Sequence, residues 1–270
     1  MTVSILQAAI IGVLAYLGSL SVPWFLGIAG GWYTLSRPLV SGLLIGMVLG
    51  DVQTGIIVGV AVQVVYIALV TPGGSMPQDL NSAAYIGVGL GVLAVKGGAS
   101  VGSAVAIATA VGAVGTIFFN FMMITNSFWN HRAIVCVEKG DQKGLKFNHY
   151  VGPQITTFLL RFIPTFAVLY MGSSIATSIL NMFPTTSFVM RTLTVLGGML
   201  PAVGVAILLR QVIKKDIELI QFIFGFTLIA ALKINMISLA FIGAFFAYLY
   251  FKQSTLKPIF SGKDDEEEDI

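Results

Sequence analysis

Four polar residues in one window of the chain, residues 37–81, have types and spacing suited to binding a ligand. They are Asp51, Gln63, Asp79 and Asn81, and each stands among apolar residues, glycines or prolines. The amide of Gln63 offers both hydrogen-bond donors and acceptors. Such a group suits a neutral ligand that carries many hydroxyl groups.

Asp51 lies in the sequence Gly-Asp-Val-Gln-Thr-Gly, between two apolar runs. A carboxylate at membrane depth costs about 2.5–3.5 kcal/mol on insertion scales unless it is paired or hydrated. Two interpretations stay open. Either Asp51 or Thr54 caps a helix that begins near Gly55, or Asp51 contacts the ligand directly, with Thr54 beside it.

Gln63 also has a structural alternative, because a buried amide can bond to a neighbouring membrane helix, a contact worth about 0.6–2 kcal/mol. Further along, segment 71–81 contains two prolines and two glycines, which break any helix. Apolar runs continue on both sides, and non-helical backbone at membrane depth is tolerated where it lines a cavity. Asp79 and Asn81 then point into such a cavity, or Asp79 is the N-cap of the next helix in an ordinary turn.

Motifs for phosphate binding or hydrolysis are absent from the sequence, which has no GxxxxGK[ST], HExxH or GxSxG pattern. A single cysteine, Cys136, excludes a cysteine-based metal cluster. Two histidines, His131 and His149, argue against a structural zinc site. The sequence therefore predicts no catalytic residue, no metal site and no cofactor.

The elements that position the polar window are expected to be membrane helices, because the composition excludes a soluble globular protein. Of 270 residues, 56% are hydrophobic and 10% are charged, whereas a soluble domain has about 25% charged residues. Residues 1–131 contain only four charged residues, which are Arg37, Asp51, Asp79 and Lys96. Four charged side chains cannot cover a water-exposed surface of ordinary size.

Apolar runs of unequal length predict an all-α polytopic domain over residues 1–255, with about seven to ten membrane-embedded segments. The runs long enough to span are 3–20, 97–124, 151–182, 192–209 and 234–251, and the short ones are 38–50, 82–95 and 219–232. Short runs broken by Gly and Pro are typical of the broken or re-entrant helices of transporters. Residues 256–270, which end in GKDDEEEDI, are expected to form a disordered acidic tail in the cytoplasm.

The basic residues predict the orientation, because cytoplasmic loops of membrane proteins are rich in Lys and Arg. The polar stretch 130–148 is expected to be a cytoplasmic loop, and two further basic clusters follow the runs 192–209 and 234–251. The excess of basic residues indicates membrane anchoring rather than nucleic-acid binding. Three isolated basic residues are assigned to turns or snorkelling positions: Arg161, Arg191 and Lys233.

The window RPLVSGLLIGMVLGDVQTGIIVGVAVQVVYI, followed by Pro77-Gln78-Asp79, resembles the IIC subunit of mannose-family sugar phosphotransferase systems (PTS). That family shows a similar R-P-L…G-x-x-x-G…G-D-x-x-T-G-I-x-x-G…Q/E pattern, followed by a P-x-D-like turn. Ser4-Ile5-Leu6-Gln7 and the segment 197–204 are similar to the family's start and second half, so the resemblance covers nearly the whole chain. Gln63 stands where some members have Glu, so no particular sugar carries over.

The resemblance implies a permease subunit of the bacterial plasma membrane that binds and translocates a hexose or an N-acetylhexosamine. It also implies a sister membrane subunit, IID, with trimers of IIC–IID heterodimers in which a moving core carries the sugar past a fixed scaffold. Phosphoenolpyruvate supplies the phosphoryl group through cytoplasmic IIA and IIB, and IIB phosphorylates the sugar. The candidate substrate-binding residues are Gln63, Asp79, Asn81, Asp51 and Thr54.

Other functions remain alternatives. An ion-coupled transporter of sugars or small solutes would accumulate the free solute and would stop when an uncoupler removes the gradient. A non-transporting receptor or scaffold is disfavoured by the many glycines, which suggest close helix approach and moving parts. An intramembrane enzyme is disfavoured because the sequence has no metal or nucleophile constellation.

Overall fold

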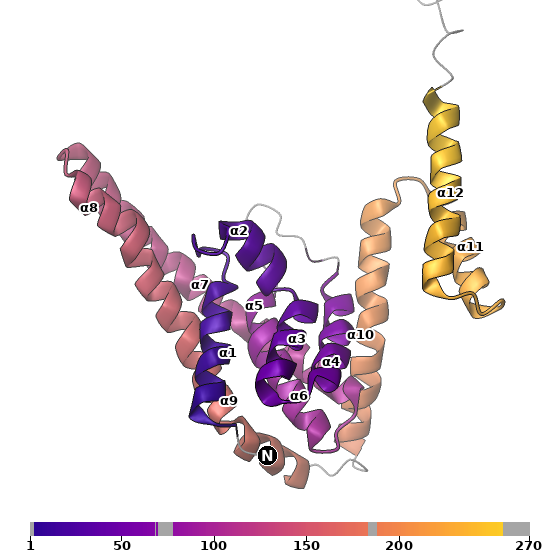
Figure 1. The fold of residues 1–270 in the computed structure, drawn as a ribbon, viewed down its shortest axis with the longest axis horizontal. Coiled ribbons are helices and arrows are strands. Elements are labelled where there is room, and N and C mark those ends of the chain that lie inside the picture. Colours follow the sequence, from indigo (N-terminus) through magenta and orange to yellow (C-terminus); the bar gives the residue numbers. More distant parts are fainter. Residues whose placement is uncertain (1–2, 68, 70–77, 183–187, 256–270) are drawn as a thin grey trace, which may run out of the picture. The chain divides into compact units, whose positions relative to one another are not determined.

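The computed structural model describes residues 3–67, 69, 78–182 and 188–255, and the regular structure in these ranges is helical throughout (Figure 1). This confirms the all-α prediction. In chain order the helices are α1 (Ile5–Leu17), α2 (Gly27–Gly30), η1 (Gly31–Leu35), α3 (Pro38–Leu49), α4 (Val52–Val65), α5 (Leu80–Ser82), η3 (Ala83–Gly87), α6 (Val88–Lys96), α7 (Val101–Glu138), α8 (Gln142–Lys146), η4 (Phe147–Val151), α9 (Gly152–Met182), α10 (Phe188–Val212), η5 (Asp216–Glu218), α11 (Leu219–Ala230) and α12 (Met236–Thr255).

Apolar helices of three kinds occur in the described part of the chain. Two, Val101–Glu138 and Gln142–Gly172, are long and apolar enough to cross a membrane. A third span is formed if Gly27–Leu35 and Pro38–Leu49, bent by 75° at their break, count as one. Six shorter apolar helices of 10–17 residues accompany them. Long, short and broken helices together confirm the membrane fold that the uneven apolar runs predict.

The stretch 130–148, predicted as a cytoplasmic loop, is helical apart from the turn at residues 139–141. Helix α7 continues to Glu138, and its 38 residues correspond to about 57 Å at 1.5 Å per residue, nearly twice the hydrocarbon core. Gly140 adopts a left-handed conformation (φ 68°) in the turn that follows, and Asp141 then caps α8 by accepting a hydrogen bond from the Gly144 amide at 2.9 Å. Polar composition here marks the surface of a helical hairpin, not an interruption of it.

The chain divides into two compact units, residues 1–209 and 210–270. The described part of the second unit holds η5, α11 and α12. Lys233, with φ 56°, lies in the turn between its two longer helices, as predicted. The predicted acidic tail, residues 256–270, lies outside the described residues.

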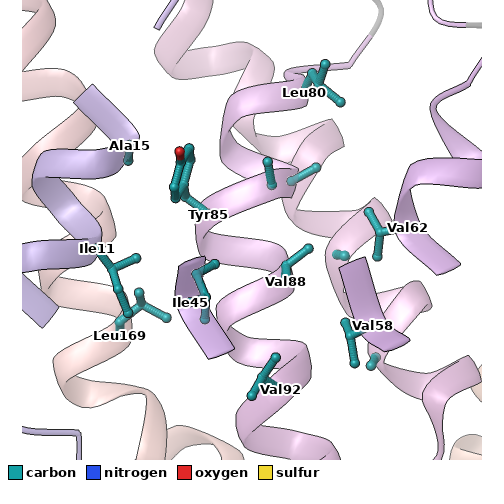
Figure 2. Close-up of a cluster of buried hydrophobic side chains, with 14 of the residues drawn as sticks. Ile11, Ala15, Ile45, Val58, Val62, Leu80, Tyr85, Val88, Val92 and Leu169 are labelled. Atoms are coloured by element: carbon teal, nitrogen blue, oxygen red, sulfur yellow. The ribbon is translucent and has the colours of Figure 1, made fainter. Parts of the chain in front are cut away.

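The centre of the first unit is the continuous helix Leu80–Lys96, formed by α5, η3 and α6. It contacts α1, α3, α4, α7 and α9, and most of its side chains are buried. A helix that is apolar on all sides is typical of a protein core or of a membrane span, and this one is enclosed by other helices. Figure 2 shows its side chains facing those of the surrounding helices; the labelled residues are Ile11, Ala15, Ile45, Val58, Val62, Leu80, Tyr85, Val88, Val92 and Leu169.

Helices α3 and α4 pack backbone to backbone through four glycines, spaced as Gly42-xxx-Gly46 and Gly55-xxx-Gly59. A Cβ added at Gly42 would lie 2.8 Å from the Cα of Gly59, and one added at Gly55 would lie 2.8 Å from the Cα of Gly46. No side chain fits into such a contact, which is the role of small residues between membrane helices. The antiparallel pair brings the start of α4 next to the end of α3.

Candidate functional site

The most deeply buried charges of the first unit form an ion pair between Asp79 and Arg161. Asp79 precedes α5 and is 0% exposed, and Arg161 lies in the middle of α9 and is 3% exposed. Arg161 Nη1 is paired with Asp79 Oδ2, and Arg161 Nη2 donates to Asp79 Oδ1 at 3.2 Å. Ser82 Oγ donates to Asp79 Oδ2 at 2.5 Å, so both carboxylate oxygens are engaged. We call Asp79, Ser82 and Arg161 the Asp79 cluster.

Two glycines of α7 let the Asp79 cluster approach that helix. The Asp79 amide donates to the carbonyl of Gly112 at 2.8 Å. One turn later, a Cβ added at Gly115 would lie 2.7 Å from Ser82 Oγ and 3.1 Å from Asp79 Cβ. The cluster is therefore held between α5, α7 and α9, with no room for a side chain on this face of α7.

The assignment of Arg161 to a turn or snorkelling position was wrong, because the residue is buried and paired. Its signal was present in the sequence. Only Asp51 and Asp79 are acidic before Glu138, and a basic residue inside an apolar run needs a partner when it faces the helix bundle. What the sequence could not show was that α9 presents Arg161 to the bundle rather than to the membrane surface.

Asn81 belongs to a second hydrogen-bond network on the same short helix. Its Nδ2 donates to the carbonyl of Ala15 at 2.9 Å and to Ser36 Oγ at 2.8 Å, and Ser36 Oγ donates to the carbonyl of Gly18. Asn81 is 2% exposed, and both hydrogens of its amide group are used. The network ties α1 and the chain after η1 to the central helix.

Asp51 and Thr54 lie elsewhere, in the turn between α3 and α4. Asp51 is the N-cap of α4, since its Oδ1 accepts a hydrogen bond from the Thr54 amide at 3.1 Å. Its Oδ2 lies 3.8 Å from Lys96 Nζ. The Thr54 amide, and to a smaller extent the Lys96 charge, hold the pKa of Asp51 below its usual value. Of the two interpretations of Asp51, this geometry matches the one in which Asp51 caps a helix.

The five predicted residues thus fall into two groups rather than one site. Gln63 is twelve positions after Asp51, about 18 Å along α4. Lys96 marks the end of the central helix near Asp51, whereas Asp79 marks its start. Asp79, Asn81 and Gln63 therefore belong to one end of the antiparallel arrangement, and Asp51 and Thr54 to the other. The proline-glycine break at 71–77 lies outside the described residues.

Two polar atoms near the end of α4 are buried without a hydrogen-bond partner among the described residues. They are Gln63 Oε1 and Tyr66 Oη. An unpaired buried polar group costs about 1–3 kcal/mol, and native proteins contain few of them. Sequence reasoning named Gln63 but missed Tyr66, whose signal was its place three residues later on the same helix.

The Tyr66 hydroxyl lies beside the Asp79 cluster. The ring is 2% exposed, and a Cβ added at Gly112 would lie 3.2 Å from Tyr66 Cζ. The carbonyl of the same glycine accepts the Asp79 amide hydrogen. Gly112 therefore contacts both Tyr66 and Asp79, and the unpaired groups of α4 adjoin the paired charges.

An open pocket of about 270 Å³ lies between the central helix, α7 and α9, and Ser82 is part of its lining. Its lining is apolar apart from that serine, which fits an apolar chain better than a ligand with many hydroxyl groups. Within the described ranges, no group of three or more His, Cys, Asp or Glu side chains could hold a metal ion. The lining includes Ser82, Ile86, Val114, Phe118, Pro164 and Val168.

The chain is similar to known proteins along most of its length. A family model described as "PTS system sorbose-specific IIC component" matches residues 5–249. The PTS mannose-specific EIIC component of Escherichia coli (strain K12) is 25% identical over 222 residues, which cover 82% of this chain and 81% of that protein. The fructose permease IIC component of Bacillus subtilis (strain 168) is 29% identical over 214 residues, 79% of this chain and 77% of that protein.

A third relative, the putative N-acetylgalactosamine permease IIC component 2 of Escherichia coli (strain K12), is 33% identical over 123 residues, 45% of this chain and 88% of that protein. Two solved structures share the fold. One, the structure of a membrane protein, has a TM-score of 0.71 at 22% identity, and the match covers 92% of this chain and 95% of that protein's chain. The other, from the complex of the mannose transporter ManYZ with microcin E492, has a TM-score of 0.53 at 23% identity and covers 97% and 100%.

Proposed function

Because the chain belongs to the family of PTS sorbose-specific IIC components, the mannose-family sugar permeases, we propose that it binds and translocates a hexose or an N-acetylhexosamine. A partner IIB protein phosphorylates the sugar with a phosphoryl group derived from phosphoenolpyruvate. The observation that carries the proposal is the family match over residues 5–249. The proposed substrate class is limited to sugars of the kinds named for the relatives, which are mannose, fructose, sorbose and N-acetylgalactosamine.

We propose that the sugar site lies at the end of α4 that faces the Asp79 cluster. Gln63 contacts the sugar, because its Oε1 is free to accept a hydrogen bond from a hydroxyl group. Asp79 and Asn81 shape the site, since the hydrogen bonds given above already engage the Asp79 carboxylate and the Asn81 amide group. Asp51 and Thr54 hold the α3–α4 turn at the far end of the helix.

We propose the partners and the placement from the family. The subunit works with a sister membrane subunit, IID, in trimers of heterodimers, and with cytoplasmic IIA and IIB. Residues 1–255 form the domain in the bacterial plasma membrane, and residues 256–270 form a cytoplasmic tail. The tip of the α7–α9 hairpin lies on the cytoplasmic side, because it carries basic residues in excess; they are Arg132, Lys139, Lys143 and Lys146.

The test uses membrane vesicles that contain the chain and IID, with IIA, IIB, the general phosphocarriers and phosphoenolpyruvate added. Mannose, fructose, sorbose and N-acetylgalactosamine are supplied in turn, and sugar phosphate is measured. Phosphorylation of one of these sugars, absent from vesicles that lack the chain, is the expected result. Phosphorylation of none of them would contradict the proposal.

A further inference from the structure

Every fourth side chain on one face of α4 is buried, and the last of them is a tyrosine. Val58 and Val62 are 0% exposed and Tyr66 is 2% exposed. The two valines face the central helix (Figure 2). Tyr66, the C-cap of α4, continues their row but adds a hydroxyl group that bonds to nothing among the described residues. Packing alone would be served by an apolar side chain at this position.

Tyr85 shows how the same fold treats a tyrosine whose hydroxyl is structural. It is 0% exposed, and its hydroxyl donates to the carbonyl of Leu35 at 2.8 Å. The Tyr66 hydroxyl has no such bond, and neither has Gln63 Oε1, three positions earlier. Residues three apart are neighbours on a helix surface, so the two residues that carry these unpaired groups occupy neighbouring positions at the end of α4.

The surroundings hold Tyr66 in place without pairing it. Gly112 leaves just enough room for the ring, and its carbonyl holds the Asp79 amide at 2.8 Å. The Asp79 charge is balanced by Arg161. A fixed hydroxyl beside a compensated ion pair is preorganised for a neutral hydrogen-bonding ligand rather than for an ion.

We propose that the Tyr66 hydroxyl and the Gln63 side-chain oxygen form one subsite that binds hydroxyl groups of the transported sugar. The tyrosine can donate and accept and the amide oxygen accepts, so together they match a pair of neighbouring sugar hydroxyls. Both atoms are buried in this conformation, so the proposed subsite requires another conformation of the transport cycle to expose them to the sugar. The inference rests on the proposed function and adds Tyr66 as a determinant of sugar specificity.

The test compares Tyr66→Phe with the matched control Tyr85→Phe in the vesicle phosphorylation assay, alongside thermal unfolding of the purified complex. Tyr66→Phe should raise the KM for the transported sugar about 3- to 10-fold, the value of one uncharged hydrogen bond. Its unfolding midpoint should stay the same or rise, because it removes an unpaired hydroxyl. Tyr85→Phe should lower the midpoint and leave the preference among the four sugars unchanged.

Monodeoxy analogues of the transported sugar identify the hydroxyl that is bound. For the wild-type chain, one analogue should have a raised KM, and for Tyr66→Phe that analogue should show no further increase over the parent sugar. Gln63→Met provides a second variant of similar size and should become insensitive to the same or the adjacent deoxy position. If the wild-type chain supports phosphorylation of none of the four sugars, the proposed function itself fails.

Two results would overturn the inference while leaving the proposed function standing. One is an unchanged KM for the parent sugar and all analogues in Tyr66→Phe. The other is a fall in the unfolding midpoint of Tyr66→Phe as large as that of Tyr85→Phe, which would show that the Tyr66 hydroxyl has a structural partner.

Discussion

Arg161 Nη2 on α9 donates to Asp79 Oδ1 at 3.2 Å, and this bond joins two residues that are 82 positions apart in the chain. It links the middle of a long helix to the start of the central helix. Because both side chains are almost completely buried, each charge depends on the other for compensation. The ion pair therefore helps to set the position of α9 against the central helix.

Removal of one partner of this pair should be strongly destabilising. Arg161→Met leaves the Asp79 carboxylate buried and unpaired, and the expected loss is about 3–5 kcal/mol. Thermal unfolding in detergent and the amount of chain inserted in the membrane measure it. The double variant Arg161→Met/Asp79→Asn should recover part of the loss, and a double variant less stable than Arg161→Met alone would contradict the coupling.

Gly115 should not tolerate a side chain. In Gly115→Ala the Cβ would meet Ser82 Oγ at 2.7 Å and Asp79 Cβ at 3.1 Å, which pushes α5 away from α7. We expect a lower unfolding midpoint and reduced sugar uptake. Gly243→Ala in α12 is the matched control, because nothing lies within 4 Å of its added Cβ; equal effects of the two variants would argue against the close contact.

Asn81→Leu should loosen the attachment of α1 to the central helix. The substitution removes the hydrogen bonds to the Ala15 carbonyl and to Ser36 Oγ, and each buried group left unpaired costs about 1–3 kcal/mol. Hydrogen exchange of the backbone amides measures the effect. The substitution should accelerate exchange in α1 and leave the exchange rate in α12 unchanged. Unchanged exchange in α1 would show that the network does not hold it.

Asp51 should make the stability of the fold fall in acid, and it should matter little for transport at neutral pH. Its pKa is lowered in the folded chain, so the unfolded chain takes up the proton first as the pH falls. The stabilisation is thus present above the ordinary pKa near 3.8 and is lost as the pH falls below it. In Asp51→Asn the unfolding midpoint should depend less on acidic pH, and sugar uptake at neutral pH should persist. Loss of uptake in a well-folded Asp51→Asn variant would instead indicate that Asp51 contacts the ligand.

The sequence predicted the membrane helices well because apolar runs report directly on what can enter a membrane. The short run 38–50 became α3, and the run 234–251 became α12. The cap at Asp51 was one of the alternatives that the sequence left open, because Asp is a preferred N-cap residue, although α4 begins at Val52 rather than near Gly55. The helices within the stretch 130–148 were not predicted, because a polar composition is compatible both with a loop and with the exposed surface of a helix.

Contacts between distant segments could not be read from the sequence. The pairing of Arg161 with Asp79 depends on how α9 is rotated about its axis, which no local pattern specifies. The close approach of Tyr66 to α7 likewise depends on Gly112, a residue of another helix. Sequence reasoning placed all five candidate residues on one sugar path, but the length of α4 separates Asp51 and Thr54 from the rest.

The chemical form of the sugar after uptake shows whether this chain works as the permease subunit of a phosphotransferase system. Radiolabelled sugar is supplied to vesicles that contain the complete system, and the accumulated product is separated with and without an uncoupler. The expected product is sugar phosphate, which forms only when phosphoenolpyruvate is present and is unaffected by the uncoupler. Accumulation of free sugar that the uncoupler abolishes would contradict the proposed function.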